Sequence, residues 1–442
     1  MFTALGKQRT RPFRRRGCAD DFGHANRSEN MHGTPGMGEP RAAVSRYSGT
    51  VRRLLASQAL VMFILWVPIW VVFLQRKGLS LTQIGILEAI AWILTAALEV
   101  PTGLIADRWG RKASIAIGAL LYSVAMFLIL TPALTPSFIL GYVLWNSSMA
   151  FVSGADSALL YDSLKADGRE SEAAKFAGRS TAIQLGSQGL AALVGSVLAT
   201  VDITLCFSIS GVLAFGAAIV MLTAREAPRY SAEGEKPLEY WKNLREAIRI
   251  AARRPAVRAL LLLSTTFSVV PVVVYYFLLQ PYAVMVGFPI AALGLVVVLI
   301  QGTTVAASWV AHRIGRRFEL RKIVTVNAVF LVGATIVIGA LPSIPSIALM
   351  LVVALVPSLV GPLLTTRIND IIPSGQRATI LSLGALIGEL GIAGLVPLLM
   401  GLADVVSPPM AIGLSAVLFG LVAIPLLIMW RASDPQPQPA IS

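Results

Sequence analysis

Twelve long apolar runs dominate the chain and limit what it can fold into. A helix of about twenty apolar residues crosses the hydrocarbon core of a bilayer. With 56% hydrophobic residues, only 14% charged residues and a mean hydropathy of +0.74, the sequence predicts an all-α membrane protein with twelve transmembrane helices. The runs cover approximately residues 54–75, 81–106, 112–131, 137–161, 178–200, 204–224, 256–279, 288–311, 320–341, 345–366, 377–402 and 408–430.

The basic residues fall almost entirely on one side of the predicted membrane. A net charge of +14 could indicate a nucleic-acid partner, so the location of the charges decides between partners. With the N-terminus inside, 35 of the 37 Lys and Arg residues lie in inside segments, and Arg76 and Lys77 lie outside. This is the positive-inside pattern. We therefore predict a multi-pass protein of the plasma membrane, the bacterial cell membrane, with both termini cytoplasmic and no nucleic-acid partner.

The polar segments divide the chain into five parts. Residues 1–50 hold no apolar run and predict a disordered, basic cytoplasmic tail. An N-terminal six-helix bundle (51–224) and a C-terminal six-helix bundle (256–431) flank a cytoplasmic linker (225–255), and 432–442 form a second tail. Apolar and basic residues in the linker alternate at helical spacing, which predicts an amphipathic helix on the inner membrane face. The apolar positions are Leu238, Trp241, Leu244, Ile248 and Ala251, and the basic ones are Lys242, Arg245, Arg249 and Arg253.

An internal repeat relates the two bundles. The segment 312–317 follows the eighth run as 107–112 follows the second. Asp162 ends the fourth run and Asp370 the tenth, while Asp202 closes the fifth and Asp404 the eleventh. These matches predict two pseudo-symmetric six-helix bundles. A titratable imidazole, His312, stands in the second copy where the first has an acid.

A charged turn, 103–112, joins the second and third runs. Small residues allow a tight connection, and charges cannot follow the chain into lipid. The pattern Gly-x-x-x-Asp-Arg-x-Gly-Arg-Lys resembles the loop between the second and third helices of the major facilitator superfamily. The resemblance implies a cytoplasmic gate with Asp107 and Arg111 as charged partners, made of Gly103, Asp107, Arg108, Gly110, Arg111 and Lys112. The alternative is a charge cluster that only holds the loop in the cytoplasm.

Four carboxylates within the runs are candidates for ion coupling, because ionisable groups in a bilayer are costly and tend to be functional. They are Glu88, Glu99, Asp156 and Glu389. Each has a structural alternative. Glu88 could reach the outer interface, Glu99 could belong to the gate, and Asp156 could pair with the basic loop. Glu389 could be a buried carboxyl bonded to a neighbouring helix.

Polar and aromatic residues recur at helical spacing within several runs and outline a candidate substrate cavity. The lining residues we expect are Trp66, Trp92, Asn146, Gln184, Gln188, Tyr275 and Gln301. Such aromatic rings could stack on a flat or cationic solute. The alternative is that the polar stripes join helices to one another and that the aromatic residues are packing or interface residues.

Several motifs of other function classes are missing from the sequence. There is no Gly-x-x-x-x-Gly-Lys-Ser/Thr phosphate loop, no His-Glu-x-x-His and no Gly-x-Ser-x-Gly, so we expect no enzyme, no cofactor and no metal. Cys18 and Cys206 have no partner spacing for a metal or a disulfide framework. No Lys or Arg lies in the middle of a run, which favours a neutral or cationic substrate over an anionic one.

The functional expectation is a secondary transporter that works by alternating access. The segments 99–103 and 153–162 resemble bacterial members of the superfamily regarded as drug or metabolite exporters, which implies proton-coupled, multidrug-like export. The fifth run lacks the proline and the fourth lacks the Arg that such antiporters usually carry. The expected partners are a small-molecule substrate, protons and membrane lipids. A proton-coupled importer or a facilitator of a metabolite remains open, as does a non-transporting membrane receptor or scaffold.

Overall fold

The computed structural model describes residues 46–228 and 237–433, and gives the backbone only for 99–108 and 237–241. Most of the predicted N-terminal tail, part of the linker and most of the C-terminal tail lie outside the described residues. Ser45–Ser442 form one compact unit. Its described residues form helices and no strands, so the all-α prediction is confirmed.

Within the described residues, eleven helical segments are long and apolar enough to cross a membrane. The first predicted run is a further, broken segment made of α1 (Ser48–Val61) and α2 (Trp70–Arg76). Together they agree with the twelve predicted spans. The eleven are α3 (Leu81–Trp109), α4 (Arg111–Leu128), α5 (Pro136–Val152) with α6 (Ala155–Ala166), α7 (Ala173–Val201), α8 (Ile203–Leu222), α10 (Pro255–Val272) with α11 (Leu279–Met285), α12 (Ile290–Arg317), α13 (Leu320–Ala340), α14 (Leu349–Ile371), α15 (Arg377–Val405) and α16 (Pro408–Ser433).

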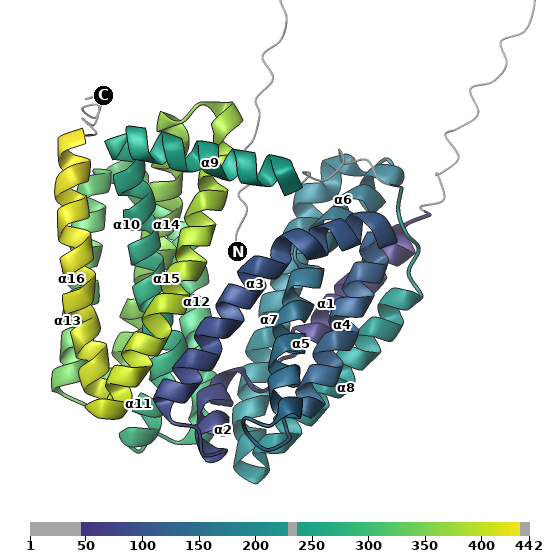
Figure 1. Cartoon of the computed structure of the whole chain (residues 1–442), viewed down its shortest axis with the longest axis horizontal. Coiled ribbons are helices and arrows are strands. Elements are labelled where there is room, and N and C mark those ends of the chain that lie inside the picture. Colours follow the sequence, from purple (N-terminus) through teal and green to yellow (C-terminus); the bar gives the residue numbers. More distant parts are fainter. Residues whose placement is uncertain (1–45, 229–236, 434–442) are drawn as a thin grey trace, which may run out of the picture. The chain divides into compact units, whose positions relative to one another are not determined.

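The helices pack as two groups that meet along two seams (Figure 1). In the first half, α1 to α8, helix α4 contacts α5 and α8, and α1 contacts α8. In the second half, α10 to α16, helix α10 contacts α14, α15 and α16, and α13 contacts α16. Across the boundary, α3 packs against α15 and α7 packs against α12. These two pairs form the boundary between the halves.

Successive helices run in opposite directions and therefore connect alternately at two ends of the bundle (Figure 1). The linker end carries helix α9 (Pro237–Arg253) and the connection between α3 and α4. The far end carries the connection from α2 to α3 and the residue between α7 and α8, Asp202. These two names are used below for the two membrane sides.

The break in the first span corrects the expected continuous helix over 54–75. Pro68 lies in the short helical turn that follows the break, and proline supplies no N–H for a helical hydrogen bond. Neighbouring helices bind the freed backbone groups. Ser210 Oγ accepts from Leu65 N at 3.2 Å, and the amide of Gln280 accepts from Val71 N at 2.8 Å and donates to Val67 O at 3.0 Å. Irregular backbone at membrane depth is stable only when protein groups satisfy it in this way.

Two glycines make the close approaches around this break possible. A Cβ on Gly195 would lie 1.9 Å from the carbonyl oxygen of Leu65, so only glycine lets α7 pack against the broken segment. A Cβ on Gly294 would lie 2.1 Å from the carbonyl oxygen of Ala192, where α12 meets α7. A side chain at Gly195 would push α7 away from the broken segment within the first half, and one at Gly294 would separate α12 from α7 at the boundary between the halves.

Two other spans also depart from regular α-helix. The fourth is interrupted at Ser153 and Gly154, where Gly154 has φ +77°. The seventh widens into a π-helical turn at Val273–Leu278, flanked by Pro271 and Pro281. A proline ring displaces the carbonyl four residues earlier, and wider helical turns of this kind recur at functional sites.

The connection between the second and third spans is shorter than expected. Helix α3 continues to Trp109 and α4 begins at Arg111, so Gly110 alone makes the turn, with φ +103°. Gly103 lies inside α3, because that helix extends beyond residue 106, where the predicted span ends. The predicted turn of 103–112 is therefore too long, because residues 103–109 lie in α3 and residues 111–112 lie in α4.

Candidate functional site

Glu88 is a buried carboxyl in the first half. Its Oε1 accepts hydrogen bonds from Trp70 Nε1 at 2.7 Å and from the Tyr142 hydroxyl at 2.8 Å. The side chain is only 4% exposed, so it does not reach the membrane interface. Glu88 lies seven residues from the start of α3, about 10 Å from the far end at 1.5 Å per residue. Both described donors are neutral, so neither supplies a positive charge to balance the carboxylate.

Aromatic rings surround this carboxyl on the side of the broken first span. The ring centroid of Trp70 lies 5.0 Å from that of Trp145 and 5.6 Å from that of Tyr142. Trp66 packs between them, 5.1 Å from Trp70 and 5.0 Å from Trp145, and donates to the Tyr122 hydroxyl at 2.9 Å. Trp66, proposed from sequence as a cavity residue, is 2% exposed and belongs to this cluster.

The second half contacts the broken first span beside this site. Gln280, which follows the π-helical turn, accepts from Val71 N at 2.8 Å and donates to Val67 O at 3.0 Å. Tyr276 is 40% exposed, and its neighbour Tyr275, an expected cavity residue, is half-buried. The second half therefore contacts the short segment that carries Trp70, one of the two hydrogen-bond donors to Glu88.

The polar face of α3 continues from Glu88 toward the linker end. Trp92 is half-buried and packs against the hydrophobic core. One turn further on, the Thr95 hydroxyl lies 3.3 Å from Asn146 Oδ1, and Asn146 Nδ2 donates to the Tyr142 carbonyl at 2.9 Å. Asn146 of α5 thus binds α3 on the linker-end side of the Glu88 carboxyl.

Asp156 belongs to a second polar network, nearer the linker end. Gln58 Nε2 donates to Asp156 Oδ2 at 3.1 Å, and Gln58 Oε1 accepts from the Ser180 hydroxyl at 2.7 Å. Gln184 Nε2 donates to the same Ser180 oxygen at 3.0 Å. The network joins α1, α6 and α7, and its described hydrogen bonds to Asp156 come from Gln58 and the Ser157 backbone, not from the basic loop.

Gln188 and Gln301 connect the two halves across the seam between α7 and α12. Gln301 Nε2 donates to Gln188 Oε1 at 2.6 Å. Gln301 also lines a groove of about 610 Å³ between these helices, together with Gly186, Gly189 and Trp309. Both glutamines were expected in the cavity, and the structure places them at the contact between the halves.

The linker-end motif is organised by an ion pair within the first half. The guanidinium of Arg111 contacts the Asp162 carboxylate and donates to the Ala158 carbonyl at 2.9 Å. The Glu226 carboxylate accepts from the backbone N–H groups of Arg111 and Lys112 at 2.8 and 3.0 Å, where a helix N-terminus favours an anion. Lys112 Nζ donates to the Leu222 carbonyl at 3.2 Å. This network ties α4 to α6 and α8.

Four predicted residues lie where the structure describes the backbone only. They are Glu99, Gly103, Asp107 and Arg108, all within α3. Glu389, the fourth candidate carboxylate, is half-buried in α15. Among the described side chains, no three His, Cys, Asp or Glu residues gather closely enough to hold a metal ion.

Hydrogen bonds join the two halves at the far end. The Asp404 carboxylate of α15 accepts from the backbone N–H groups of Leu81 and Thr82 at 3.0 and 2.7 Å, so it caps α3 of the other half. The Thr82 hydroxyl donates to the same carboxylate at 2.7 Å. Ser196 of α7 donates to the Ala291 carbonyl of α12 at 2.8 Å. With the Gln280 contacts described above, these bonds join the two halves at the far end.

Sequence reasoning missed several of these residues. Gln58 and Gln280 are glutamines beside or inside apolar runs, and the cost of a polar group in a membrane was the signal that could have identified them. Asp162 and Asp404 were noticed only as marks of the internal repeat. Glu226 gave no local signal, because its role depends on α4 beginning beside it.

Comparisons with known proteins agree on one family. Residues 54–394 match the sequence profile described as Major Facilitator Superfamily. An uncharacterized MFS-type transporter of Bacillus subtilis (strain 168), YxaM, is 37% identical over 94 residues, which span 20% of this chain and 22% of that protein. The chain thus matches about a fifth of the length of this curated relative.

Solved structures share the fold at low sequence identity. A variant of the nucleoside transporter NupG has a TM-score of 0.72 at 12% identity, covering 88% of this chain and all of that one (100%). A bacterial homologue of the human lysosomal transporter Spinster, in an inward-facing, unoccupied conformation, has a TM-score of 0.67 at 18% sequence identity, covering 90% of this chain and 98% of that one. A D-xylose-proton symporter has a TM-score of 0.61 at 15% sequence identity, covering 89% of this chain and 98% of that one.

Proposed function

Because the chain belongs to the Major Facilitator Superfamily and is a multi-pass secondary transporter of a small molecule, we propose that it exchanges protons for a neutral or cationic solute and exports that solute from the cell. The observation that carries the proposal is Glu88, a buried carboxyl with two neutral hydrogen-bond donors, beside the broken first span. Discontinuous helices near the boundary between halves are where secondary transporters place their binding sites.

The proton step is assigned to Glu88. Protonation removes its charge and weakens its role as acceptor for Trp70 and Tyr142, and deprotonation restores both contacts. Since these donors lie on α2 and α5, the change alters how α3 is held within the first half. Gln280 of the second half bonds Val71, on the same short helix as Trp70, so the same change reaches the boundary between the halves.

The solute class follows from the site's chemistry. The rings of Trp70, Tyr142 and Trp145 lie within 5.6 Å of one another, and aromatic faces attract cations and flat apolar molecules. Glu88 supplies the only carboxyl among these contacts. A cationic solute and a proton would compete for it, which gives exchange a simple physical basis.

The conformational cycle is a rocking of the halves about the seams α3–α15 and α7–α12. The linker end is assigned to the cytoplasm by its basic residues, and the far end to the outside. Asp404 and Gln280 would release α3 and the broken span when the far end opens. Asp107 and Arg111 remain the proposed cytoplasmic gate, with Arg111 already anchored by Asp162 in this conformation.

Export rests on the resemblance of residues 99–103 and 153–162 to exporters. Uptake by proton symport is the second candidate, because one protein of the same fold is named a D-xylose-proton symporter. Both share the carboxyl and the cycle and differ only in the direction of solute movement relative to protons.

The test is reconstitution into liposomes loaded with a fluorescent lipophilic cation, with a pH step imposed in each direction. Export by exchange predicts that dye moves against the proton flow and that a protonophore abolishes the movement. Dye or metabolite movement in the same direction as protons would replace exchange by symport. Movement that ignores the pH step would leave facilitated diffusion as the function.

A further inference from the structure

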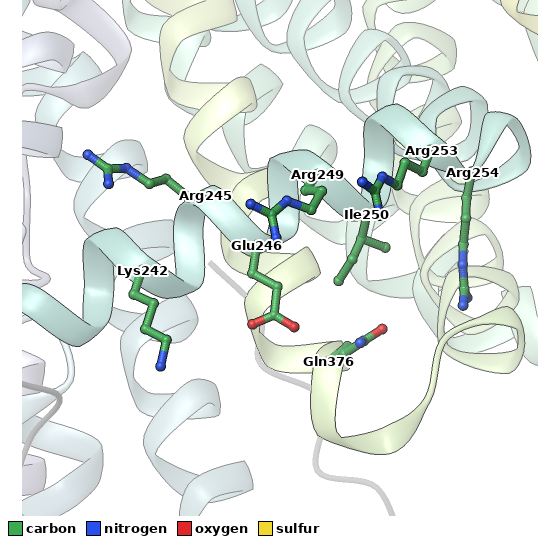
Figure 2. A pocket seen from close by; sticks show the side chains of 8 residues that line it. All are labelled: Lys242, Arg245, Glu246, Arg249, Ile250, Arg253, Arg254 and Gln376. Carbon is green, nitrogen blue, oxygen red and sulfur yellow. The ribbon is translucent and has the colours of Figure 1, made fainter.

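A basic pocket of about 810 Å³ lies at the linker end, between α9 and the start of α15 (Figure 2). Five of its eight lining residues are basic and one, Glu246, is acidic, so the lining carries a net formal charge of +4. The basic residues are Lys242, Arg245, Arg249, Arg253 and Arg254. This pocket is separate from the Glu88 site, which lies about 10 Å from the far end.

The five basic residues that line the pocket form a stripe along α9 and the residue after it, and the packing of α9 fixes the position of this basic stripe. Ala247 is fully buried, and Leu244 and Ala251 pack against the hydrophobic core. The helix contacts α15 and α10 through this face, so its other side remains solvent-accessible. The basic side chains of the stripe are exposed. A helix anchored in this way presents its charges in a defined arrangement.

The stripe is electrostatically unbalanced. Arg245, Arg249 and Arg253 follow one another at four-residue intervals, and like charges at this spacing repel. Ion pairs among the described residues join Arg111 with Asp162, Arg169 with Glu172 and Lys322 with Glu319, and none includes a residue of the stripe. Arg254 is held in place by a 3.4 Å contact of Nη1 with the Ile371 carbonyl. An anion in the pocket would remove the repulsion.

Two acceptors complete the pocket. Gln376 Oε1 is buried and accepts no hydrogen bond from any residue in the described ranges. The carboxylate of Glu246 extends from α9 toward Gln376 (Figure 2). Buried polar atoms without a partner call for one, and here the missing partner is a donor. The pocket therefore fits a ligand that carries both an anionic group and a hydroxyl.

We propose that this pocket binds a phosphoglycerol group, supplied by the headgroup of an anionic phospholipid or by a soluble glycerol phosphate. The phosphate lies against Arg249 and Arg253, whose planar guanidinium groups suit phosphate oxygens, and a glycerol hydroxyl donates to Gln376. The proposal depends on neither the transported solute nor the direction of transport.

The test is binding to the purified full-length protein in a non-ionic detergent. Three probes are compared by their dissociation constants: phosphatidylglycerol, zwitterionic phosphatidylcholine and soluble glycerol 3-phosphate. Arg249→Gln with Arg253→Gln is expected to weaken phosphatidylglycerol at least about tenfold, since each lost charge-assisted contact is a strong one. Arg316→Gln with Arg317→Gln removes the same charge from exposed linker-end residues outside the pocket and is expected to change binding less than about twofold.

Two further variants keep the test valid if the double Gln variant folds poorly. Arg249→Lys with Arg253→Lys retains the charge and is expected to recover part of the affinity. Gln376→Leu retains every charge and is expected to reduce the preference for phosphatidylglycerol over phosphatidic acid, which lacks the glycerol hydroxyls. Glycerol 3-phosphate binding with the same dependence on Arg249 and Arg253 would identify the soluble source. Equal weakening by both arginine pairs, or phosphatidylcholine binding as tight as phosphatidylglycerol, would overturn the proposal.

Discussion

Among the described side chains, three charged ones are buried in the first half, Glu88, Arg111 and Asp162, whereas the buried polar ones in the second half, such as Gln280 and Asn327, are uncharged. The halves are nevertheless built alike, with α4, α5 and α8 packed together in one and α13, α14 and α16 in the other. This difference supports our proposal that proton coupling is located in the first half. The second half contacts the first half through two neutral side chains, Gln280 and Gln301.

The linker-end motif gives the largest expected difference between the halves. Arg111→Gln leaves Asp162 buried and unpaired and is expected to lower the free energy of unfolding by about 3 kcal/mol. Its counterpart Arg316 is exposed, and Arg316→Gln is expected to change it by less than about 0.5 kcal/mol. Thermal unfolding in detergent measures both. Equal loss in both variants would contradict the asymmetry.

A second comparison uses two buried tyrosines. Tyr142→Phe removes a donor to the Glu88 carboxylate, and hydrogen bonds to charged groups contribute about 1.5–3 kcal/mol, so the initial rate of gradient-driven transport is expected to fall about tenfold. Tyr282 bonds the neutral Ser346 hydroxyl in the second half, and Tyr282→Phe is expected to change the rate less than about threefold. Rates in liposomes at matched protein amounts decide. A larger effect of Tyr282→Phe than of Tyr142→Phe would place the coupling site in the second half and contradict the assignment to Glu88.

The repeat-related aspartates at the far end test closure. Asp404 caps α3 across the boundary, while Asp202 caps its own helix through Thr204 N at 2.8 Å. Asp404→Asn leaves one acceptor oxygen where the carboxylate uses two, so it is expected to weaken the contact between the halves at the far end by about 1 kcal/mol, which enriches the open form about fivefold. Asp202→Asn is expected to leave the distribution unchanged.

The readout is the distance between spin labels on Leu134→Cys and Leu341→Cys, two exposed far-end positions of opposite halves, with Cys18 and Cys206 replaced. A longer distance population in Asp404→Asn alone would support the cap. The same shift in both aspartate variants would mean that the far end responds to surface charge and not to the contact across the boundary.

The smallest expected effect concerns the glutamine pair. Interhelical polar contacts in membranes contribute about 0.6 kcal/mol on average, so Gln301→Leu is expected to change the transport rate two- to threefold. Gln184→Leu removes a contact inside the first half and serves as the control. A loss of more than about tenfold in Gln301→Leu would make this pair a substrate contact and not a link between the halves.

The sequence predicted the twelve spans and the family because apolar length and a charged turn are local signals. It did not predict the break after Val61, because the compensating groups, Ser210 and Gln280, lie far away in the chain. For the same reason it did not predict that Trp66, an expected cavity residue, packs against Trp70 and Trp145. The repeat marked Asp162 and Asp404, but it could not say which partners they would meet.

The most direct test of the central claim separates solute exchange from proton coupling in Glu88→Gln and Glu389→Gln. Counterflow of labelled solute, measured without a pH gradient, reports binding and rocking, and gradient-driven accumulation reports coupling. We predict that Glu88→Gln retains counterflow of a neutral solute and loses its gradient-driven accumulation at least about tenfold, while Glu389→Gln retains both. Undiminished accumulation in Glu88→Gln would contradict the assignment of proton coupling to the first half.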